Sequence, residues 1–245
     1  RSLIEDTLPS VCHDETRFHL AGAFLESGGN ALVMTSTDGH RLTKSQRPYK
    51  TAFLTRVDSG RSVGGIIIRE HALKEIKRNL VEGDCKIAMS KTHLFVKQGE
   101  WTLVTKPIDA QFPPYEQVIP RDAKILVTCD KNALIEACKR SKVFATETRG
   151  VALTLSTGTL SLRSDNPDAG ELIETIDADY AKGEGFKIGV NAVFLIAALE
   201  AMEGESVVLA LGNELDPIMV RSIDDAAMRT IENAELLVVV MPMRI

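Results

Sequence analysis

The feature that most constrains the fold of this chain is an internal repeat. The triplet Leu-Ile-Glu at residues 3–5 recurs at residues 134–136. Each copy continues through a polar stretch to an arginine, Arg17 or Arg149, and then into segments in which apolar and polar residues alternate. Such a repeat indicates two copies of one supersecondary unit, and 245 residues are enough for two domains with separate cores.

The first half of each copy predicts a β-hairpin. Alternation of apolar and polar residues is typical of a strand with one buried face, and serine and glycine between two such segments favour a turn. The predicted strand pairs are residues 19–26 with 31–36, and residues 151–155 with 159–163.

The second halves of the two copies also correspond. Each contains a short apolar strand, an amphipathic helix, a Glu-Gly turn, paired strands and a last strand that runs into a proline. These segments are strands 66–68 and 186–190, helices 71–81 and 192–202, turns 82–83 and 203–204, and closing segments 104–107 and 239–242.

These elements indicate an α+β fold with antiparallel sheets and helices packed on one face of the sheets. A proline-bearing segment, residues 113–122, precedes a strand predicted at residues 125–129. We therefore expect domains at residues 1–120 and 121–245. Pro9 should end or kink the opening helix, because proline lacks the backbone N–H that an interior helical position needs.

Composition narrows the classes of function. The chain has no run of about 18 or more apolar residues and no N-terminal signal segment, so we expect a cytoplasmic protein. A net charge of −5 predicts that any contact with nucleic acid uses a local basic patch. Four cysteines without a CxxC pair are expected to be reduced, mostly buried thiols rather than disulfides or zinc ligands. They are Cys12, Cys85, Cys129 and Cys138.

The segment Thr-Asp-Gly-His-Arg-Leu at residues 37–42 admits two interpretations. Asp38 and His40 could bind a metal ion or share a proton in a hydrolase. The alternative is a turn, since Asp-Gly is typical of turns and His40 and Arg41 could anchor it through hydrogen bonds. No second carboxylate-histidine cluster, phosphate loop, dinucleotide motif or serine elbow is present in the sequence. The turn is favoured, and no catalytic residue, metal or cofactor is expected.

Two predicted helices carry basic residues outside their apolar stripes. On a single helix such charges usually form only a solvated face. Equivalent helices of a repeated fold would instead add their charges along one surface, giving sequence-independent contact with phosphates. These residues are Lys74, Lys77 and Arg78 in the first copy, and Lys131, Lys139 and Arg140 in the second.

The carboxyl-terminal segment, residues 236–245, begins as an apolar strand and ends with apolar residues, where chain ends are usually polar. Met241 and Met243 flank Pro242 and would form an adaptable apolar surface for partner side chains. The alternative is a last core strand with no binding role.

Three motifs of this chain resemble the bacterial DNA polymerase III β subunit family, the sliding clamps. They are Thr-Asp-Gly-His-Arg-Leu at residues 37–42, Phe-Pro-Pro-Tyr at residues 112–115 and Val-Met-Pro-Met-Arg-Ile at residues 240–245. Their order and approximate spacing are those of the family. The resemblance extends from the first helix to the last residue.

The resemblance implies repeated DNA-clamp domains, each with antiparallel sheets outside and two helices on the inner face. Residues 1–120 would be the middle domain of three and residues 121–245 the C-terminal domain, with the first domain absent before Arg1. In that family, full-length subunits join head to tail as a homodimeric ring around duplex DNA, and Val143 and Phe144 would lie at such an interface. The ring is a non-catalytic processivity factor that holds DNA polymerase, the clamp loader and repair proteins on DNA.

The resemblance also implies a peptide-binding groove between the middle and C-terminal domains. It would accept partner segments that begin with glutamine and end in leucine and phenylalanine. Its lining would be Leu20, Thr37, Gly39, His40, Arg41, Leu42, Pro113, Val118, Asn191, Phe194, Pro217, Val239, Val240, Met241, Pro242, Met243 and Arg244. The residues facing duplex DNA would be Arg17, Lys74, Lys77, Arg78, Lys131, Lys139 and Arg140.

Overall fold

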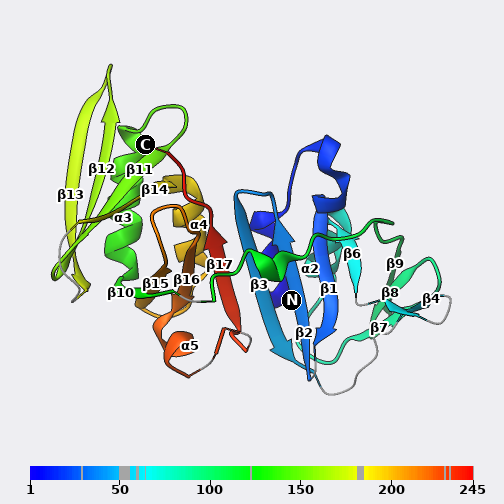
Figure 1. The fold of residues 1–245 in the computed structure, drawn as a ribbon. Coiled ribbons are helices and arrows are strands. Elements are labelled where there is room, and N and C mark those ends of the chain that lie inside the picture. Colours follow the sequence, from blue (N-terminus) through cyan, green and yellow to red (C-terminus); the bar gives the residue numbers. More distant parts are fainter. Residues whose placement is uncertain are drawn as a thin grey trace. The chain divides into compact units, whose positions relative to one another are not determined.

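The structure, a computed structural model, consists of two compact units, unit 1 (Arg1–Pro114) and unit 2 (Tyr115–Ile245) (Figure 1). The division falls a few residues before the position 120 suggested by the sequence. The described residues are 1–28, 30–49, 56–58, 61–63, 65–121, 123–180, 185–228, 230–231 and 233–244. Ile245, the last residue of the terminal motif, lies outside them.

Over the described residues, unit 1 contains a larger antiparallel sheet, a smaller one and two α-helices. The larger sheet has the order β3-β2-β1-β6, and the smaller sheet has the order β7-β8-β9. A separate hairpin pairs β4 (Arg56–Asp58) with β5 (Arg61–Val63). The other elements are α1 (Ser2–Thr7), β1 (Gly22–Gly28), β2 (Ala31–Thr37), β3 (Arg41–Pro48), β6 (Ile66–Arg69), α2 (Glu70–Asn79), β7 (Lys86–Met89), β8 (Leu94–Gln98) and β9 (Trp101–Thr105).

For the start of unit 1, one of two sequence-based predictions is confirmed and the other is wrong. Helix α1 ends at Thr7 and the chain continues as a 3-10 turn at Leu8–Ser10, so the predicted effect of Pro9 is confirmed. The strand predicted at residues 19–26 is wrong at its start, because Glu15–Leu20 forms a 3-10 helix and β1 begins at Gly22. At Gly22 a Cβ atom would lie 2.2 Å from the carbonyl oxygen of Ile68, so only glycine permits β1 to pair with β6 here.

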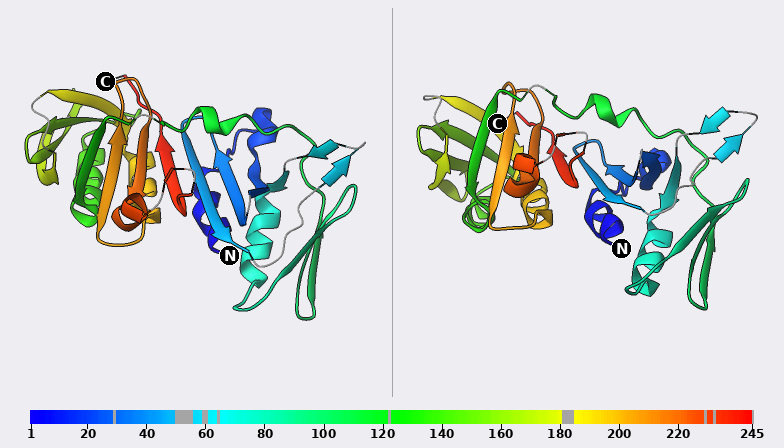
Figure 2. Two further views of the ribbon diagram at one scale, coloured as in Figure 1. Left: turned by 60° about the horizontal axis from the view of Figure 1, so that its bottom comes forward. Right: turned by 90° about the horizontal axis from the view of Figure 1, so that it is seen from below.

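The core of unit 1 lies between the sheets and the helices. Both α1 and α2 pack on one side of the larger sheet (Figure 2). Helix α2 buries Ala72, Leu73 and Ile76, which lie three and four residues apart as an amphipathic helix requires. Hydroxyl groups attach the start of the unit to the sheet: Ser36 Oγ donates to the Thr7 carbonyl at 2.6 Å.

Unit 2 repeats much of the element order of unit 1, and several of its elements are longer. Its strands follow the order β14-β11-β12-β13-β10-β15-β16-β17, and every pairing is antiparallel. The elements are β10 (Ile125–Asp130), α3 (Lys131–Val143), β11 (Gly150–Ser156), β12 (Thr159–Asn166), β13 (Gly170–Asp179), β14 (Phe186–Asn191), α4 (Ala192–Ala201), β15 (Ser206–Leu211), β16 (Ile218–Ser222), α5 (Ile223–Met228) and β17 (Leu236–Val240).

The helices of unit 2 begin where their sequences provide a cap. The Asp130 carboxylate accepts the backbone N–H of Ala133 at 2.7 Å at the start of α3, and Asn191 Oδ1 accepts that of Val193 at 2.9 Å at the start of α4. Helices α3 and α4 contact each other and pack against the core (Figure 1). The predicted α+β fold with antiparallel sheets is therefore confirmed in both units.

Helix α5 was not predicted from the sequence. It is held to β16 by a buried ion pair in which Arg221 Nε lies 3.2 Å from Asp225 Oδ2, with side chains 7% and 9% exposed. The Asp225 carboxylate also accepts the backbone N–H of Glu235 at 3.0 Å. Two partners hold this carboxylate, as a buried charge requires.

The cysteines are free thiols. Cys12, Cys129 and Cys138 are buried and Cys85 is half-buried, as the sequence predicts. Burial raises the pKa of the Cys129 and Cys138 thiols to about 12, so both stay protonated at neutral pH. None of the helices in the described part of the chain is both long and apolar enough to span a membrane.

Candidate functional site

The segment at residues 37–42 is the turn of the β2–β3 hairpin. Asp38 Oδ1 accepts the backbone N–H groups of His40 at 2.9 Å and Arg41 at 3.0 Å, and Asp38 Oδ2 lies 3.0 Å from Arg41 Nε. Gly39 has a φ of +88°, which favours glycine. The carboxylate of Asp38 is thus engaged in holding the turn.

The same turn fixes Arg17. Its Nη1 donates to the Asp38 carbonyl at 2.7 Å, and its Nε lies 3.1 Å from Asp14 Oδ2. Over the described ranges, no group of three His, Cys, Asp or Glu side chains is placed to hold a metal ion. The turn interpretation of Asp38 and His40 is confirmed, and the hydrolase alternative has no support.

Five of the seven predicted groove residues of unit 1 belong to this segment, residues 37–42. Leu20 and Leu42 are buried, at 6% and 2% exposure. Thr37 Oγ1 donates to the Arg41 carbonyl at 2.7 Å and accepts the Gly39 N–H at 3.1 Å, so its hydroxyl belongs to the turn. His40 is exposed at its tip, and Pro113 is half-buried near the end of the unit.

Unit 2 has a hollow of about 680 Å³ lined by three of the predicted groove residues, Val118, Pro217 and Met241. All three side chains are half-buried, so they offer apolar surface without belonging to the core. The other lining residues are Glu116, Gln117, Ile119, Pro120, Arg121, Gly212 and Asp216.

Sequence reasoning missed the Gly212–Asp216 side of this hollow. Asp216 Oδ2 accepts both the backbone N–H and the side-chain amide of Asn213, each at 2.8 Å. A Cβ atom at Gly212 would lie 2.4 Å from Asp216 Oδ2, so a side chain here would displace the Asp216 carboxylate. The Gly-Asn pair was the available signal, since these residues are typical of turns.

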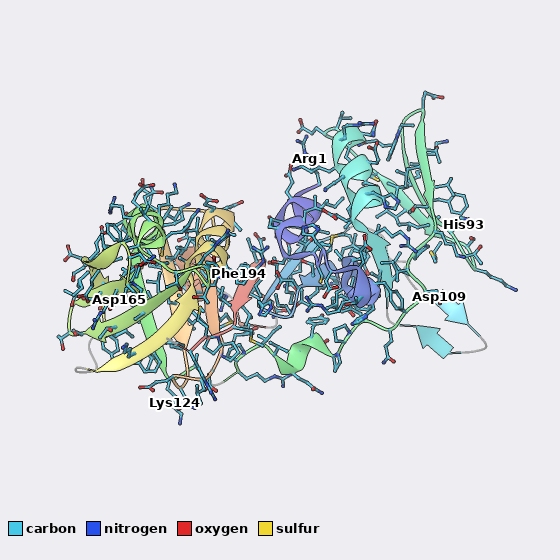
Figure 3. All side chains as sticks on the ribbon, turned by 90° about the horizontal axis from the view of Figure 1, so that it is seen from above. Arg1, His93, Asp109, Lys124, Asp165 and Phe194 are labelled. Carbon is cyan, nitrogen blue, oxygen red and sulfur yellow. The ribbon has the colours of Figure 1, made fainter. Side chains whose placement is uncertain are left out.

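The remaining groove residues of unit 2 differ in exposure. Val239 and Val240 are fully buried in β17, whereas Pro242 and Met243 are half-buried and Arg244 is exposed. The backbone N–H of Met243 donates to the Gly189 carbonyl at 2.9 Å, so the chain end runs beside β14. Asn191 caps α4 and Phe194, labelled in Figure 3, lies on that helix and packs partly against the core.

Every residue that the sequence assigns to DNA contact has a polar partner. On α2, Lys74 pairs with Glu70 at 2.8 Å and Arg78 with Glu75 at 2.7 Å, while Lys77 lies 3.5 Å from Glu5. In unit 2 the partners are the Met202 carbonyl for Lys131, Glu136 for Lys139 and Glu174 for Arg140. The helices therefore carry mixed charge rather than a purely basic stripe.

Two of these carboxylates have altered acidity. A hydrogen bond from Arg140 holds the pKa of Glu174 below its usual value of 4.5. A hydrogen bond from Arg1, followed by the charges of Arg1 and Lys77, lowers the pKa of Glu5. Both acids stay ionised at neutral pH and offset part of the positive charge beside them.

Family models match both units. The DNA polymerase III beta subunit, central domain, matches residues 1–114, and the C-terminal domain of the same family matches residues 116–244.

Curated relatives and solved structures agree with these models. A beta sliding clamp of Pseudomonas putida strain KT2440 is 33% identical over 248 residues, and that of Escherichia coli K12 is 28% identical over 250 residues. Each comparison covers 100% of this chain and 63% of the relative. The crystal structure of the DNA polymerase III subunit beta from Pseudomonas aeruginosa has a TM-score of 0.86 at 30% identity, again over 100% of this chain and 63% of that chain.

The chain thus spans less than two thirds of the length of these relatives. The two family models, the relatives and the solved structure concern the same two domains. This chain belongs to the DNA polymerase III beta subunit family, of which it comprises the central and C-terminal domains.

Proposed function

We propose that this chain supplies two domains of a sliding clamp, a non-catalytic processivity factor that encircles duplex DNA and tethers DNA polymerase, the clamp loader and repair proteins. Family membership over both units supports this proposal, because the relatives bear the name beta sliding clamp. The use of Asp38 in a turn supports the absence of catalysis at that position.

The observation that carries the proposed peptide-binding function is the apolar hollow of unit 2. Its lining includes Val118, Pro217 and Met241, which the family resemblance assigns to the groove. An apolar slot with exposed backbone suits a peptide with two apolar anchors.

The proposed contact with DNA rests on the basic side chains of α2 and α3. Lys74 and Arg78 are 62% and 74% exposed, so they can reach phosphates, yet each is also paired with a carboxylate. Such mixed charge favours weak contact with the sugar-phosphate backbone and gives no readout of bases. Weak, sequence-independent contact suits a clamp that must move along DNA.

The proposed self-association surface lies in unit 2. Val143 at the end of α3 is 73% exposed and Ile173 on β13 is 65% exposed. Over the described residues, β13 pairs with β10 only at Ala178 and Asp179, so most of this edge is open. An open edge and exposed apolar side chains are typical of a surface that pairs with another chain.

The experiment that tests the function is calorimetric titration of the chain with a glutamine-led peptide ending in leucine and phenylalanine. Griselimycin, which is bound in a crystal structure of the Pseudomonas aeruginosa clamp, is the competitor. We expect saturable binding that griselimycin displaces, and no binding of a peptide with both apolar anchors replaced by serine. Equal binding of the two peptides, or none of either, would contradict the proposal.

A further inference from the structure

The small sheet of unit 1 has one face in the core and one face open to solvent. Ile87, Met89, Leu94, Val96, Trp101 and Leu103 point inward. The alternating residues point outward and are exposed; they are Lys86, Ala88, Phe95, Lys97, Thr102 and Val104. We call this set the open face.

The open face carries an apolar row across all three strands. The register places Ala88 opposite Phe95 and Phe95 opposite Val104. Phe95 is 37% exposed and Val104 is 53% exposed. Outward residues of a half-buried antiparallel sheet are normally polar, and contiguous exposed apolar side chains mark interaction surfaces.

The repeat within the chain provides a comparison for this face. The register of unit 2 places Ala210, Met219 and Val239 in the equivalent row, which is only 0–3% exposed. The next row there contains Arg221, which is bonded to Asp225 of α5.

Helix α5 therefore covers part of the outward face in unit 2. In unit 1 the corresponding connection between β8 and β9 is the two-residue turn Gly99-Glu100, which contains no helix.

Lysines surround the apolar row. Lys86 and Lys97 face each other in the neighbouring row. Lys91 and Lys106 line a hollow of about 130 Å³ at the end of the sheet, together with Asp109, which Figure 3 labels on the same unit. Within the described part of the chain none of these four lysines has an ion-pair partner, whereas all three basic residues of α2 do. The open face is thus positive on a chain whose net charge is −5.

We propose that the open face of β7, β8 and β9 is a docking site for an acidic protein segment in which carboxylates alternate with apolar residues. The apolar row would accept its apolar side chains and the flanking lysines its carboxylates. A single aromatic side chain, Phe95, favours a peptide over single-stranded nucleic acid, which usually stacks on several aromatic rings. The proposal goes beyond the clamp function, since no residue of the open face belongs to the proposed groove.

Trp101, the only tryptophan of the chain, lies on the inner side of β9. Its fluorescence emission can therefore report on changes in this sheet. The probe is a short fluorescent peptide of alternating glutamate and leucine, followed by anisotropy and by Trp101 emission. We expect saturable binding that weakens as salt screens the lysines. Phe95→Ser and Lys97→Glu should each lower the affinity about tenfold. Lys187→Glu, a matched charge reversal at an exposed position of β14 in unit 2, should leave the affinity unchanged.

Three outcomes would contradict the proposal that the open face is a docking site. They are no binding of the glutamate-leucine peptide, equal binding by Lys97→Glu and the unchanged chain, and tighter binding of a single-stranded oligothymidylate than of the peptide. Thermal unfolding of each variant confirms that it is folded. Lys97→Glu should keep its affinity for the glutamine-led peptide, so a failure of this site and a failure of the clamp groove are distinguishable.

Discussion

Asp38 and Arg41 form an ion pair, with Oδ2 and Nε 3.0 Å apart, at the turn of the β2–β3 hairpin. Both side chains are only 15% exposed. The other oxygen of the same carboxylate accepts two backbone N–H groups, so one side chain satisfies both the turn and the arginine. The motif that could suggest catalysis is instead the turn of this hairpin.

Replacing Asp38 with alanine should destabilise unit 1 by about 1–3 kcal/mol, because two backbone N–H groups and Arg41 lose their acceptor. Asp38→Asn keeps the Oδ1 acceptor and should cost less. Chemical denaturation measures both free energies of unfolding. Glu75→Ala, which removes an exposed partner of Arg78, is the control and should change stability by less than about 0.5 kcal/mol. An Asp38→Ala chain as stable as the unchanged one would contradict the role of the turn.

The buried Arg221–Asp225 pair should be far more sensitive than exposed pairs. Asp225→Ala leaves the Arg221 guanidinium buried without its carboxylate and should destabilise unit 2 by about 3–5 kcal/mol. The double change Arg221→Met with Asp225→Leu should recover most of that loss, since no buried charge remains. Asp165→Ala, at an exposed pair with Arg163, is the control. If Asp225→Ala and Asp165→Ala unfold at the same temperature, the buried Arg221–Asp225 pair does not contribute more stability than an exposed pair.

Removing residues 243–245 should weaken binding of the glutamine-led peptide about thirtyfold, or about 2 kcal/mol, because the end of the proposed groove is lost. The backbone bond from Met243 to Gly189 is lost as well, so circular dichroism must show that the fold persists. Val143→Ala removes an exposed apolar side chain elsewhere in unit 2 and should leave the affinity unchanged. Equal affinities of the truncated and intact chains in calorimetry would exclude this groove assignment.

The pKa of Glu174 gives a pH-dependent prediction. Arg140 lowers this pKa in the folded chain, so the link between α3 and β13 contributes stability above the usual pKa of 4.5 and loses it as pH falls through the lower folded value. Carboxyl NMR titration should find the Glu174 pKa below 4.5 and returning toward it in Arg140→Gln. Arg163→Gln should leave the Glu174 pKa unchanged. A pKa of 4.5 in the unchanged chain would show that the ion pair does not persist in solution.

Several elements were predictable from local sequence. The strands predicted at residues 151–155 and 159–163 lie within β11 and β12, and the helix predicted at residues 192–202 is α4 at Ala192–Ala201. Alternation, amphipathic spacing and capping residues operate between neighbours in the chain, so a single sequence records them. The turn at residues 37–42 was predictable for the same reason, because the Asp38 carboxylate bonds to His40 and Arg41 within the motif.

Other features required the tertiary structure. The start of β1 is set by the close approach of Gly22 to Ile68, and the partners of Lys77 and Arg140, Glu5 and Glu174, come from other elements. The exposed row at Phe95 and its buried counterpart at Met219 have the same alternating pattern in sequence. The sequence determined which side chains share a face of each strand or helix, because that periodicity is local. Only the tertiary structure decided which faces are covered and which charges are paired, because those depend on segments far apart in the chain.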